Sequence, residues 1–216
     1  MLYNNDYKER AFNMNYNLNL KKILNQIDKK KKPSLLLHSC CGPCSSYVIT
    51  YLKDYFEITV YYYNSNIYPI EEYKHREYEQ LRLLKALNIK YLDSIYDDEF
   101  NIVANGLEDL KEGELRCYNC IKYRMENTCV KAKILNFDYF ATTLSVSPHK
   151  NALWINEIGL NLEDKYNVKY LVSDFKKEDG YKKSIEIAKE YNLYRQDYCG
   201  CKYSLKNRRN GYEQIK

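Results

Sequence analysis

The sequence predicts an α/β protein built on a parallel sheet that is flanked by helices. Short apolar runs alternate with longer segments of helical periodicity, and this alternation is typical of strands joined by crossover helices. A length of 216 residues suffices for one sizeable core. The composition is 45% hydrophobic and 29% charged, which is typical of a globular protein and excludes low-complexity disorder.

Three strands and three helices are expected in the first half of the chain. The first strand is a short apolar run, and the second is rich in β-branched and aromatic residues. The helix between them is indicated by side chains at helical spacing, namely Tyr47, Val48, Tyr51, Leu52 and Tyr55. The next helix is amphipathic along its length. In chain order, the expected elements are helix 18–27, strand 34–39, helix 45–56, strand 57–63, helix 70–87 and strand 90–92.

The second half continues the alternation, with a turn expected at Gly113. Its expected elements are helix 99–111, helix 121–135, strand 139–143, helix 155–165, strand 168–172 and helix 182–191. We divide the chain into a polar N-terminal lead-in with a helix, an α/β domain that carries the chemistry, and a basic C-terminal tail. These parts are expected at 1–33, 34–201 and 202–216.

Seven of the eight cysteines fall in three short motifs. The first motif follows the first strand directly, whereas the other two lie in polar settings in which turns are expected. The chain starts without the basic and apolar stretches of a signal peptide, so the thiols are expected to be reduced and to serve metal or redox chemistry in the cytoplasm. The motif cysteines are Cys40, Cys41 and Cys44, then Cys117 and Cys120, then Cys199 and Cys201.

The first cysteine motif is expected at the binding edge of the sheet. Ligands of parallel α/β sheets gather beyond the carboxyl ends of the strands. Segment 38–44 follows the first strand, and segment 142–150 follows a later one. The two segments are therefore expected to face one pocket.

Three interpretations of the cysteines are open. Cys41 to Cys44 reads Cys-Gly-Pro-Cys, the redox motif of thioredoxin-like thiol-disulfide oxidoreductases, but the other cysteines are then unexplained. A structural zinc site in an RNA-interaction module would use the two Cys-x-x-Cys pairs and leave Cys40 unused. Iron–sulfur ligation uses the most thiols. Cys129 lies within an expected helix, and we interpret it as a structural thiol.

Five blocks of residues between 35 and 201 resemble the cobalamin-independent epoxyqueuosine reductases of the QueH family. The first surrounds Cys40, Cys41 and Cys44, and the others follow in the order of the family. They contain Asn66 to Pro69 with Arg76, Arg116 to Cys120 with Arg124, Thr142 to Lys150, and Tyr198 to Cys201.

The resemblance implies a Rossmann-like sheet related to the nucleotide-binding α-hydrolases. It also implies a 4Fe-4S cluster beside an additional mononuclear iron, both held by the family's cysteines. The implied reaction is the last step of queuosine synthesis, in which epoxyqueuosine is reduced at the wobble position of a tRNA anticodon. The seven motif cysteines are therefore the expected metal ligands.

Roles for other residues follow from this reaction as hypotheses. Cys40 and Cys44 are expected to be catalytic as well as ligating. His38 and His149 are candidate proton donors, although His38 at a strand end is equally suited to orienting a ligand or capping a turn. The expected substrate-binding residues are Tyr68, Arg76, Arg116, Arg124, Thr143, Ser145, Ser147 and Lys150. Two alternatives are open: Arg76 pairs with Glu72 on its own helix face, and the threonine and serine hydroxyls satisfy a turn.

The expected partners are a tRNA that bears epoxyqueuosine and an external electron donor. The formal charge of +5 is concentrated in two flanks, the lysines at 29–32 and the basic residues at 202–209, which are plausible phosphate contacts. No stretch reaches the roughly 20 apolar residues of a membrane span. No Gly-rich phosphate loop is present, so nothing in the sequence supports a role for ATP.

Overall fold

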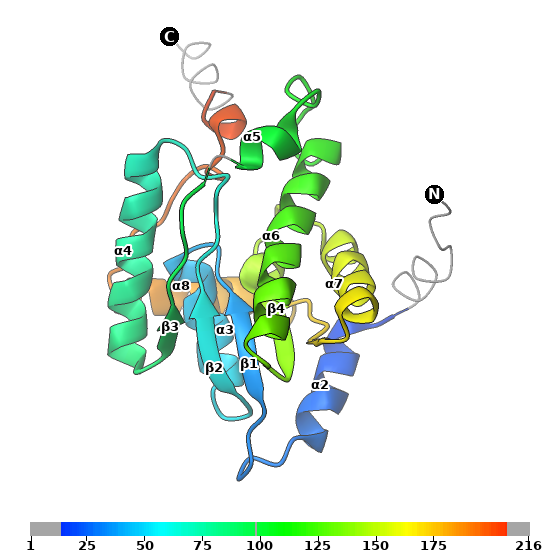
Figure 1. Cartoon of the computed structure of the whole chain (residues 1–216). Coiled ribbons are helices and arrows are strands. Elements are labelled where there is room, and N and C mark those ends of the chain that lie inside the picture. The colour runs from blue at the N-terminus through cyan, green and yellow to red at the C-terminus, as the bar shows by residue number, and fades with distance from the viewer. Residues whose placement is uncertain (1–13, 98, 207–216) are drawn as a thin grey trace.

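A five-stranded parallel sheet organises the protein (Figure 1). The computed structural model describes residues 14–97 and 99–206. Within this part, the strand order is β3-β2-β1-β4-β5, so the expected parallel α/β sheet is confirmed. The strands are β1 (Ser34–His38), β2 (Glu57–Tyr61), β3 (Lys90–Leu92), β4 (Tyr139–Thr142) and β5 (Lys169–Tyr170).

The strand order reverses between β1 and β4. The chain starts at the central strand β1, adds β2 and β3 on one side, and then returns to add β4 and β5 on the other. In the β1–β4 register, His38 lies opposite Thr142, the last residue of each strand. The loops after β1 and β4 therefore leave the sheet side by side, at the switch point where α/β proteins bind ligands.

Helices cover both faces of the sheet (Figure 1). Helices α6 and α7 pack with one cluster of buried side chains, and α2, α3 and α4 contribute to the cluster on the opposite face, where α8 packs against α3. The helices are α2 (Tyr16–Gln26), α3 (Gly42–Leu52), α4 (Ile70–Leu87), α5 (Glu99–Ala104), α6 (Leu115–Ile134), α7 (Ala152–Tyr166) and α8 (Gly180–Glu190), with a 3-10 turn η1 (Thr143–Val146) after β4.

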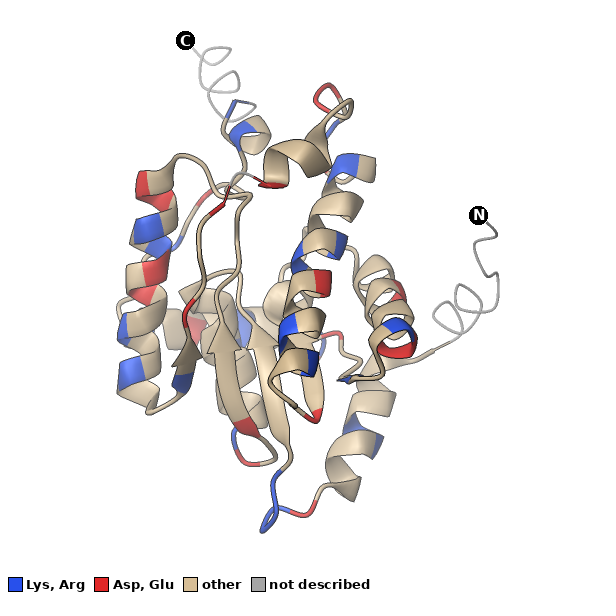
Figure 2. Cartoon of the chain, viewed as in Figure 1, with Lys and Arg blue, Asp and Glu red and all other residues tan. Residues whose placement is uncertain are grey.

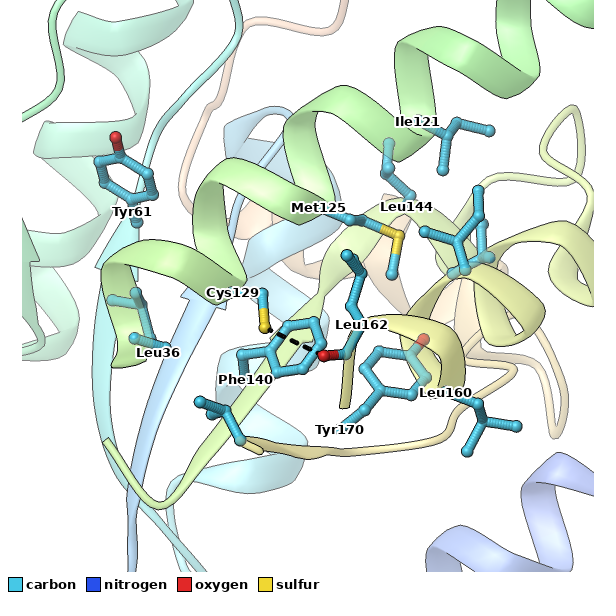
Figure 3. Close-up of a cluster of buried hydrophobic side chains, with 14 of the residues drawn as sticks. Leu36, Tyr61, Ile121, Met125, Cys129, Phe140, Leu144, Leu160, Leu162 and Tyr170 are labelled. Carbon is cyan, nitrogen blue, oxygen red and sulfur yellow. Dashed lines mark hydrogen bonds between the residues drawn. The ribbon is translucent and has the colours of Figure 1, made fainter. Parts of the chain in front are cut away.

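Successive side chains of the strands point to opposite faces of the sheet, and the cluster beneath α6 and α7 takes the side chains of one face. Leu36 of β1 and Phe140 of β4 point to this face and meet Met125 and Cys129 of α6 (Figure 3). Leu35 and Leu37 point to the other face, because successive strand side chains alternate. Burying each large apolar side chain contributes about 1.5–3 kcal/mol.

Cys129 belongs to this core rather than to the site. Its side chain is fully buried, and its thiol donates a hydrogen bond to the Leu162 carbonyl oxygen over 3.8 Å (Figure 3). The expectation of a structural thiol is confirmed.

Two helix boundaries differ from the prediction in a way that affects the site. The helix expected to begin at 45 begins at Gly42, because Pro43 suits the first turn of a helix. The helix expected to begin at 121 begins at Leu115, so the turn-like setting expected for Cys117 and Cys120 is wrong. Both cysteines lie on the first turns of α6, one helical turn apart.

Most other elements agree with the sequence. Helix 70–87 and strand 90–92 are found with the expected bounds. The helix expected at 99–111 ends already at Ala104, ahead of Gly106, whose φ of +74° suits glycine.

The ends of the chain are described only in part. Residues 1–13 of the expected lead-in and 207–216 of the expected basic tail, including Arg208 and Arg209, lie outside the described residues. Within the described lead-in, α2 buries Leu20 and Leu24 in the same core as β1. The described part of the chain contains no helix long and apolar enough to cross a membrane.

Candidate metal centre and substrate cavity

Three thiols meet in the loop between β1 and α3. The Sγ atoms of Cys40, Cys41 and Cys44 all lie within 4.8 Å of one another. Cys41 is the extended residue before α3, and its carbonyl oxygen accepts a hydrogen bond from Ser45 Oγ over 3.0 Å. Because Pro43 starts the helix early, Cys44 falls in the first turn and is brought back towards Cys40. We call these three residues the first thiol group.

The first thiol group favours one ionised sulfur. Hydrogen bonds from the Cys41 and Cys44 thiols lower the pKa of Cys40 well below its usual value. The same interaction with Cys40 raises the pKa of Cys41 to about 12 and also raises the pKa of Cys44. A soft metal ion that displaces the remaining protons suits such a set of sulfurs.

A buried hydrogen-bond chain joins the first thiol group to β4. The His38 Nε2–H donates to the Tyr63 carbonyl oxygen (3.1 Å), so Nδ1 accepts from Thr142 Oγ1 (2.8 Å). The Thr143 hydroxyl lies 3.4 Å from Cys40 Sγ and accepts from the Cys40 backbone N–H over 3.2 Å. Burial, followed by the charge of Arg124, lowers the pKa of His38 to about 4.

Gln80 of α4 holds the same loop from the other side. It is fully buried, and its Oε1 accepts hydrogen bonds from Ser39 Oγ (2.6 Å) and Ser45 Oγ (2.7 Å). These two serines bracket the first thiol group in sequence, so a single side chain fixes both ends of the loop.

The second thiol group consists of Cys117 and Cys120 from α6 and of Cys199 and Cys201 from the C-terminal segment. Cys120 packs in one buried cluster with Cys201. A hydrogen bond from Cys201, together with the charge of Lys150, lowers the pKa of Cys199 well below its usual value. All of these thiols are free.

A buried arginine and a partly buried lysine face the thiol groups. Lys150 Nζ donates to Cys199 Sγ over 3.0 Å, and the charge of this thiolate raises the pKa of Lys150. Arg124 lies within electrostatic range of Cys120, Cys199, Cys40 and Cys117, members of both groups. Its guanidinium donates to Asn64 Oδ1 (3.2 Å) and to the Cys120 carbonyl oxygen (3.3 Å).

Arg76 fixes the turn that carries Cys199. Its guanidinium pairs with Glu72 (2.7 Å) and donates to the carbonyl oxygens of Cys199 (3.3 Å) and Tyr198 (3.4 Å). Gly200 follows with a φ of +118°, and its carbonyl oxygen accepts from the Tyr68 N–H over 2.8 Å. A Cβ at Gly200 would lie 2.9 Å from Arg76 Nη1, so glycine is required here.

Both thiol groups open on one cavity of about 600 Å³. Segments 38–44 and 142–150 both contribute to its wall, as expected from the switch point. Predicted site residues that line it are Cys40, Cys44, Arg76, Arg124, Ser147, His149, Lys150 and Cys199.

Several predicted site residues lie elsewhere. Arg116 is buried and donates to the carbonyl oxygens of Leu107 (3.0 Å), Glu108 (2.8 Å) and Leu110, so it secures that loop. Ser145 is buried against Ser173 at 3.3 Å. The remaining predicted residues do not line the cavity, namely His38, Cys41, Tyr68, Cys117, Cys120, Thr143 and Cys201.

Sequence reasoning missed part of the cavity wall. Asn64 and Asn66 follow β2, so the rule that led to segment 38–44 would also have found them. No motif marks several other residues of the wall, which come from the loop before α6, from α8 and from the segment before Cys199. They include Glu112, Tyr181, Ser184, Arg195, Gln196 and Asp197.

The lysines at 29–32 and the cavity lie at opposite edges of the sheet. Segment 29–32 precedes β1 and lies at the amino edge (Figure 2), whereas the loops after β1 and β4 that line the cavity leave the carboxyl edge. Of the described residues of the second flank, Lys202 donates a hydrogen bond to Asn101 Oδ1 over 2.8 Å. The first flank is therefore not positioned near a ligand in the cavity.

Fold and site together define a Rossmann-like α/β protein with a thiol-rich site of the metal-binding type. A family model described as "Epoxyqueuosine reductase QueH" matches residues 35–207. Curated proteins of that name are similar over most of their length. The one from Streptococcus pyogenes serotype M1 is 41% identical over 98% of this chain and 88% of its own, and the one from Thermotoga maritima is 33% identical over 84% and 95%.

The chain belongs to the epoxyqueuosine reductase QueH family. The expectation of an epoxyqueuosine reductase, an oxidoreductase of tRNA queuosine synthesis, is thereby confirmed, and family membership argues against the thioredoxin-like and zinc-module interpretations. Among solved structures, the U34-tRNA thiolase NcsA from Methanococcus maripaludis with its [4Fe-4S] cluster matches with a TM-score of 0.50 at 14% identity. That match covers 93% of this chain and 69% of the other, and it supports the fold.

Proposed function

We propose that the protein reduces epoxyqueuosine to queuosine at the wobble position of tRNA, with an iron–sulfur cluster and an additional iron held by the two thiol groups. The observation that carries this proposal is the single cavity on which thiols from residues 40–44 and 199 both open. An external donor supplies the electrons. The cytoplasm, where thiols stay reduced, suits the eight free cysteines, seven of which belong to the motifs.

The reaction consumes two electrons and two protons. Both C–O bonds of the epoxide break, a carbon–carbon double bond forms, and the oxygen leaves as water. The site must therefore hold the epoxide, receive electrons, and deliver protons to one oxygen atom.

The residues present fit an iron-containing group. Three sulfurs within 4.8 Å of one another, and four more thiols behind and beside them, provide soft donors in sufficient number for more than one centre. When bound, such a group supplies electrons singly and acts as a Lewis acid towards the epoxide oxygen. All seven motif cysteines are proposed ligands, and Cys40, Cys44 and Cys199 are nearest the substrate because they line the cavity.

Arg124 and Lys150 balance the negative charge of the thiolates. Arg124 is buried and Lys150 is partly buried, and thiolates buried without compensating charge would be costly. Their hydrogen bonds to protein atoms orient them towards the sulfurs rather than towards solvent. They are thus proposed to act on the metal site more than on the nucleoside.

His149 is the proposed proton donor. It is exposed and lines the cavity, whereas both ring nitrogens of His38 are occupied by Thr142 and Tyr63. With its pKa near 4, His38 is neutral at physiological pH. We therefore assign His38 the orienting role, namely fixing Thr142 and the end of β1.

The cavity suits one nucleoside. Sites for small ligands span roughly 300–1,000 Å³, and the cavity of about 600 Å³ falls in this range. Chemistry on a base requires that the nucleotide be turned out of its stack. Ser147 at the cavity wall is a proposed contact of that nucleoside, and Tyr68 and Thr143 beside it are proposed to support the wall.

One experiment tests the proposal. Protein purified without oxygen and loaded with iron is incubated with tRNA bearing epoxyqueuosine and a strong reductant, and the nucleosides are then analysed. Queuosine should form, and iron analysis should find more than four irons per chain. Cys199→Ala should abolish conversion, while Cys129→Ala, a cysteine of the core, should preserve it. A colourless protein with one firmly bound zinc and no conversion would refute the proposal.

A further inference from the structure

We propose that Arg195 and Tyr181, at the mouth of the cavity, bind the RNA beside the wobble nucleoside. Arg195 contacts a backbone phosphate, and Tyr181 stacks on a neighbouring base. The inference rests on the proposed function, since it takes an anticodon loop as the ligand. Neither residue belongs to a motif that the sequence singles out.

Arg195 differs from Arg76, Arg124 and Lys150, the other cations of the cavity wall, because those three are already hydrogen-bonded to protein atoms. Arg76 holds Glu72 and two carbonyl oxygens, Arg124 holds Asn64 and the Cys120 carbonyl, and Lys150 holds Cys199. Arg195 lines the same cavity and is exposed, and its guanidinium makes no hydrogen bond or ion pair with any residue that the structure describes. A free guanidinium at the entrance suits a phosphate, which it can bind with two parallel hydrogen bonds.

The backbone on either side of Arg195 is fixed. Arg82 donates to the carbonyl oxygens of Tyr191 (2.9 Å) and Asn192 (2.7 Å), and the Tyr194 N–H donates to Glu79 Oε2 (2.9 Å). After it, Arg76 holds Tyr198. Arg195 is therefore presented on an ordered segment, which lowers the entropy lost when it binds a phosphate.

Tyr181 of α8 supplies an accessible aromatic side chain at the same cavity. It lies in the first turn of α8, is 38% exposed and lines the cavity together with Ser184. A base that is turned into the cavity leaves its neighbours in the loop without a stacking partner. An exposed tyrosine ring offers a replacement, as in proteins that bind single strands.

The charges around the mouth restrict where the RNA backbone can pass. Glu112 and Asp197 also line the cavity and repel phosphates, whereas Arg195 and His149 attract or tolerate them. The lysines at 29–32 lie at the far edge of the sheet and cannot substitute for Arg195 near the nucleoside.

Salt dependence of tRNA binding tests the role of Arg195. Each phosphate contact with a single strand adds about 0.7 to the slope of log affinity against log salt. Arg195→Ala in the iron-loaded full chain should weaken binding of epoxyqueuosine tRNA about tenfold at about 50 mM salt and about fourfold at about 200 mM, because the slope falls by one contact. Arg195→Lys should keep the slope, because it keeps the charge.

Controls separate this inference from the proposed function. Lys31→Ala, from the other basic flank, should bind with the wild-type slope, and Tyr181→Ala should weaken binding about fivefold or more while Tyr181→Phe does not. A wild-type slope in Arg195→Ala, or a reduced slope in Lys31→Ala instead, would overturn the inference even if wild-type enzyme converts the tRNA. Wild-type enzyme that neither binds nor converts this tRNA would overturn the proposed function, and the inference with it.

Discussion

Replacing Gly200 by alanine tests whether the turn between Cys199 and Cys201 is set by its contact with Arg76. The added Cβ would lie 2.9 Å from Arg76 Nη1 and 3.2 Å from Ile67 Cγ1. The guanidinium cannot easily move aside, because Glu72 and the carbonyl oxygens of Tyr198 and Cys199 hold it.

The magnitude has two parts. A non-glycine residue at a φ of +118° costs about 1–3 kcal/mol in backbone strain. Displacing Arg76 weakens two hydrogen bonds from a charged donor, and at 3.3 and 3.4 Å these contribute about 1 kcal/mol each. We therefore expect Gly200→Ala to lower the free energy of unfolding by about 3–5 kcal/mol.

Gly106→Ala is the matched control. Gly106 also has a positive φ, +74°, but a Cβ there meets nothing within 4 Å. It should cost only the strain of a left-handed residue, about 1–2 kcal/mol, and leave iron content and conversion of epoxyqueuosine tRNA at wild-type levels. Urea unfolding gives the stability of both variants, and iron analysis with nucleoside analysis gives their function.

The difference between the two variants decides the question. Gly200→Ala should lose at least tenfold in conversion rate at a temperature where it remains folded. Equal stability losses and wild-type conversion in both variants would show that Arg76 does not set the position of Cys199.

Three further predictions follow from contacts described above. Phe140→Ala should lower the free energy of unfolding by about 3–5 kcal/mol, measured in urea, because it opens a cavity beneath α6; a loss below about 1 kcal/mol would contradict this packing. The ion pair with Arg82 lowers the pKa of Glu79 in the folded state, so the stabilisation is present above the unfolded-state pKa and is lost as the pH falls through the folded-state pKa. Glu79→Gln should therefore flatten the acid side of the plot of unfolding free energy against pH, and an unchanged plot would contradict a role for this pair. Lys150→Met leaves the Cys199 thiolate without its cation, so the variant should retain less iron than wild type after gel filtration, and equal iron contents would exclude that role.

The sequence was informative about the sheet and its binding edge for a physical reason. The apolar run of β1 and the paired segments 38–44 and 142–150 follow from local periodicity and from the switch-point rule. The start of α6 could not be read in this way, because Arg116, Cys117 and Cys120 are polar or small and give no apolar stripe. Tertiary packing, not local preference, extends that helix to Leu115.

The pair of Arg76 with Glu72 was expected as an alternative to a phosphate contact, because the two residues lie one helical turn apart, and it is confirmed. The partners of Arg116 and Arg124 could not be anticipated, because these arginines bind carbonyl oxygens of a loop and the side chain of Asn64. Which cation remains free depends on contacts between residues up to 123 positions apart in the chain, and local periodicity does not reveal such contacts.

The attachment of segment 191–199 to α4 orders the steps of maturation. Cys199 and Cys201 follow every described strand in the chain, and Cys199 reaches the cavity that Cys40 and Cys44 line when this segment lies against a finished α4. During synthesis, the first thiol group is therefore made before Cys199 and Cys201, and the site is incomplete while the sheet assembles. Because the two large core clusters are built mainly from apolar side chains of the sheet and its helices, a shortage of the proposed iron should yield a folded but empty protein rather than an unfolded chain.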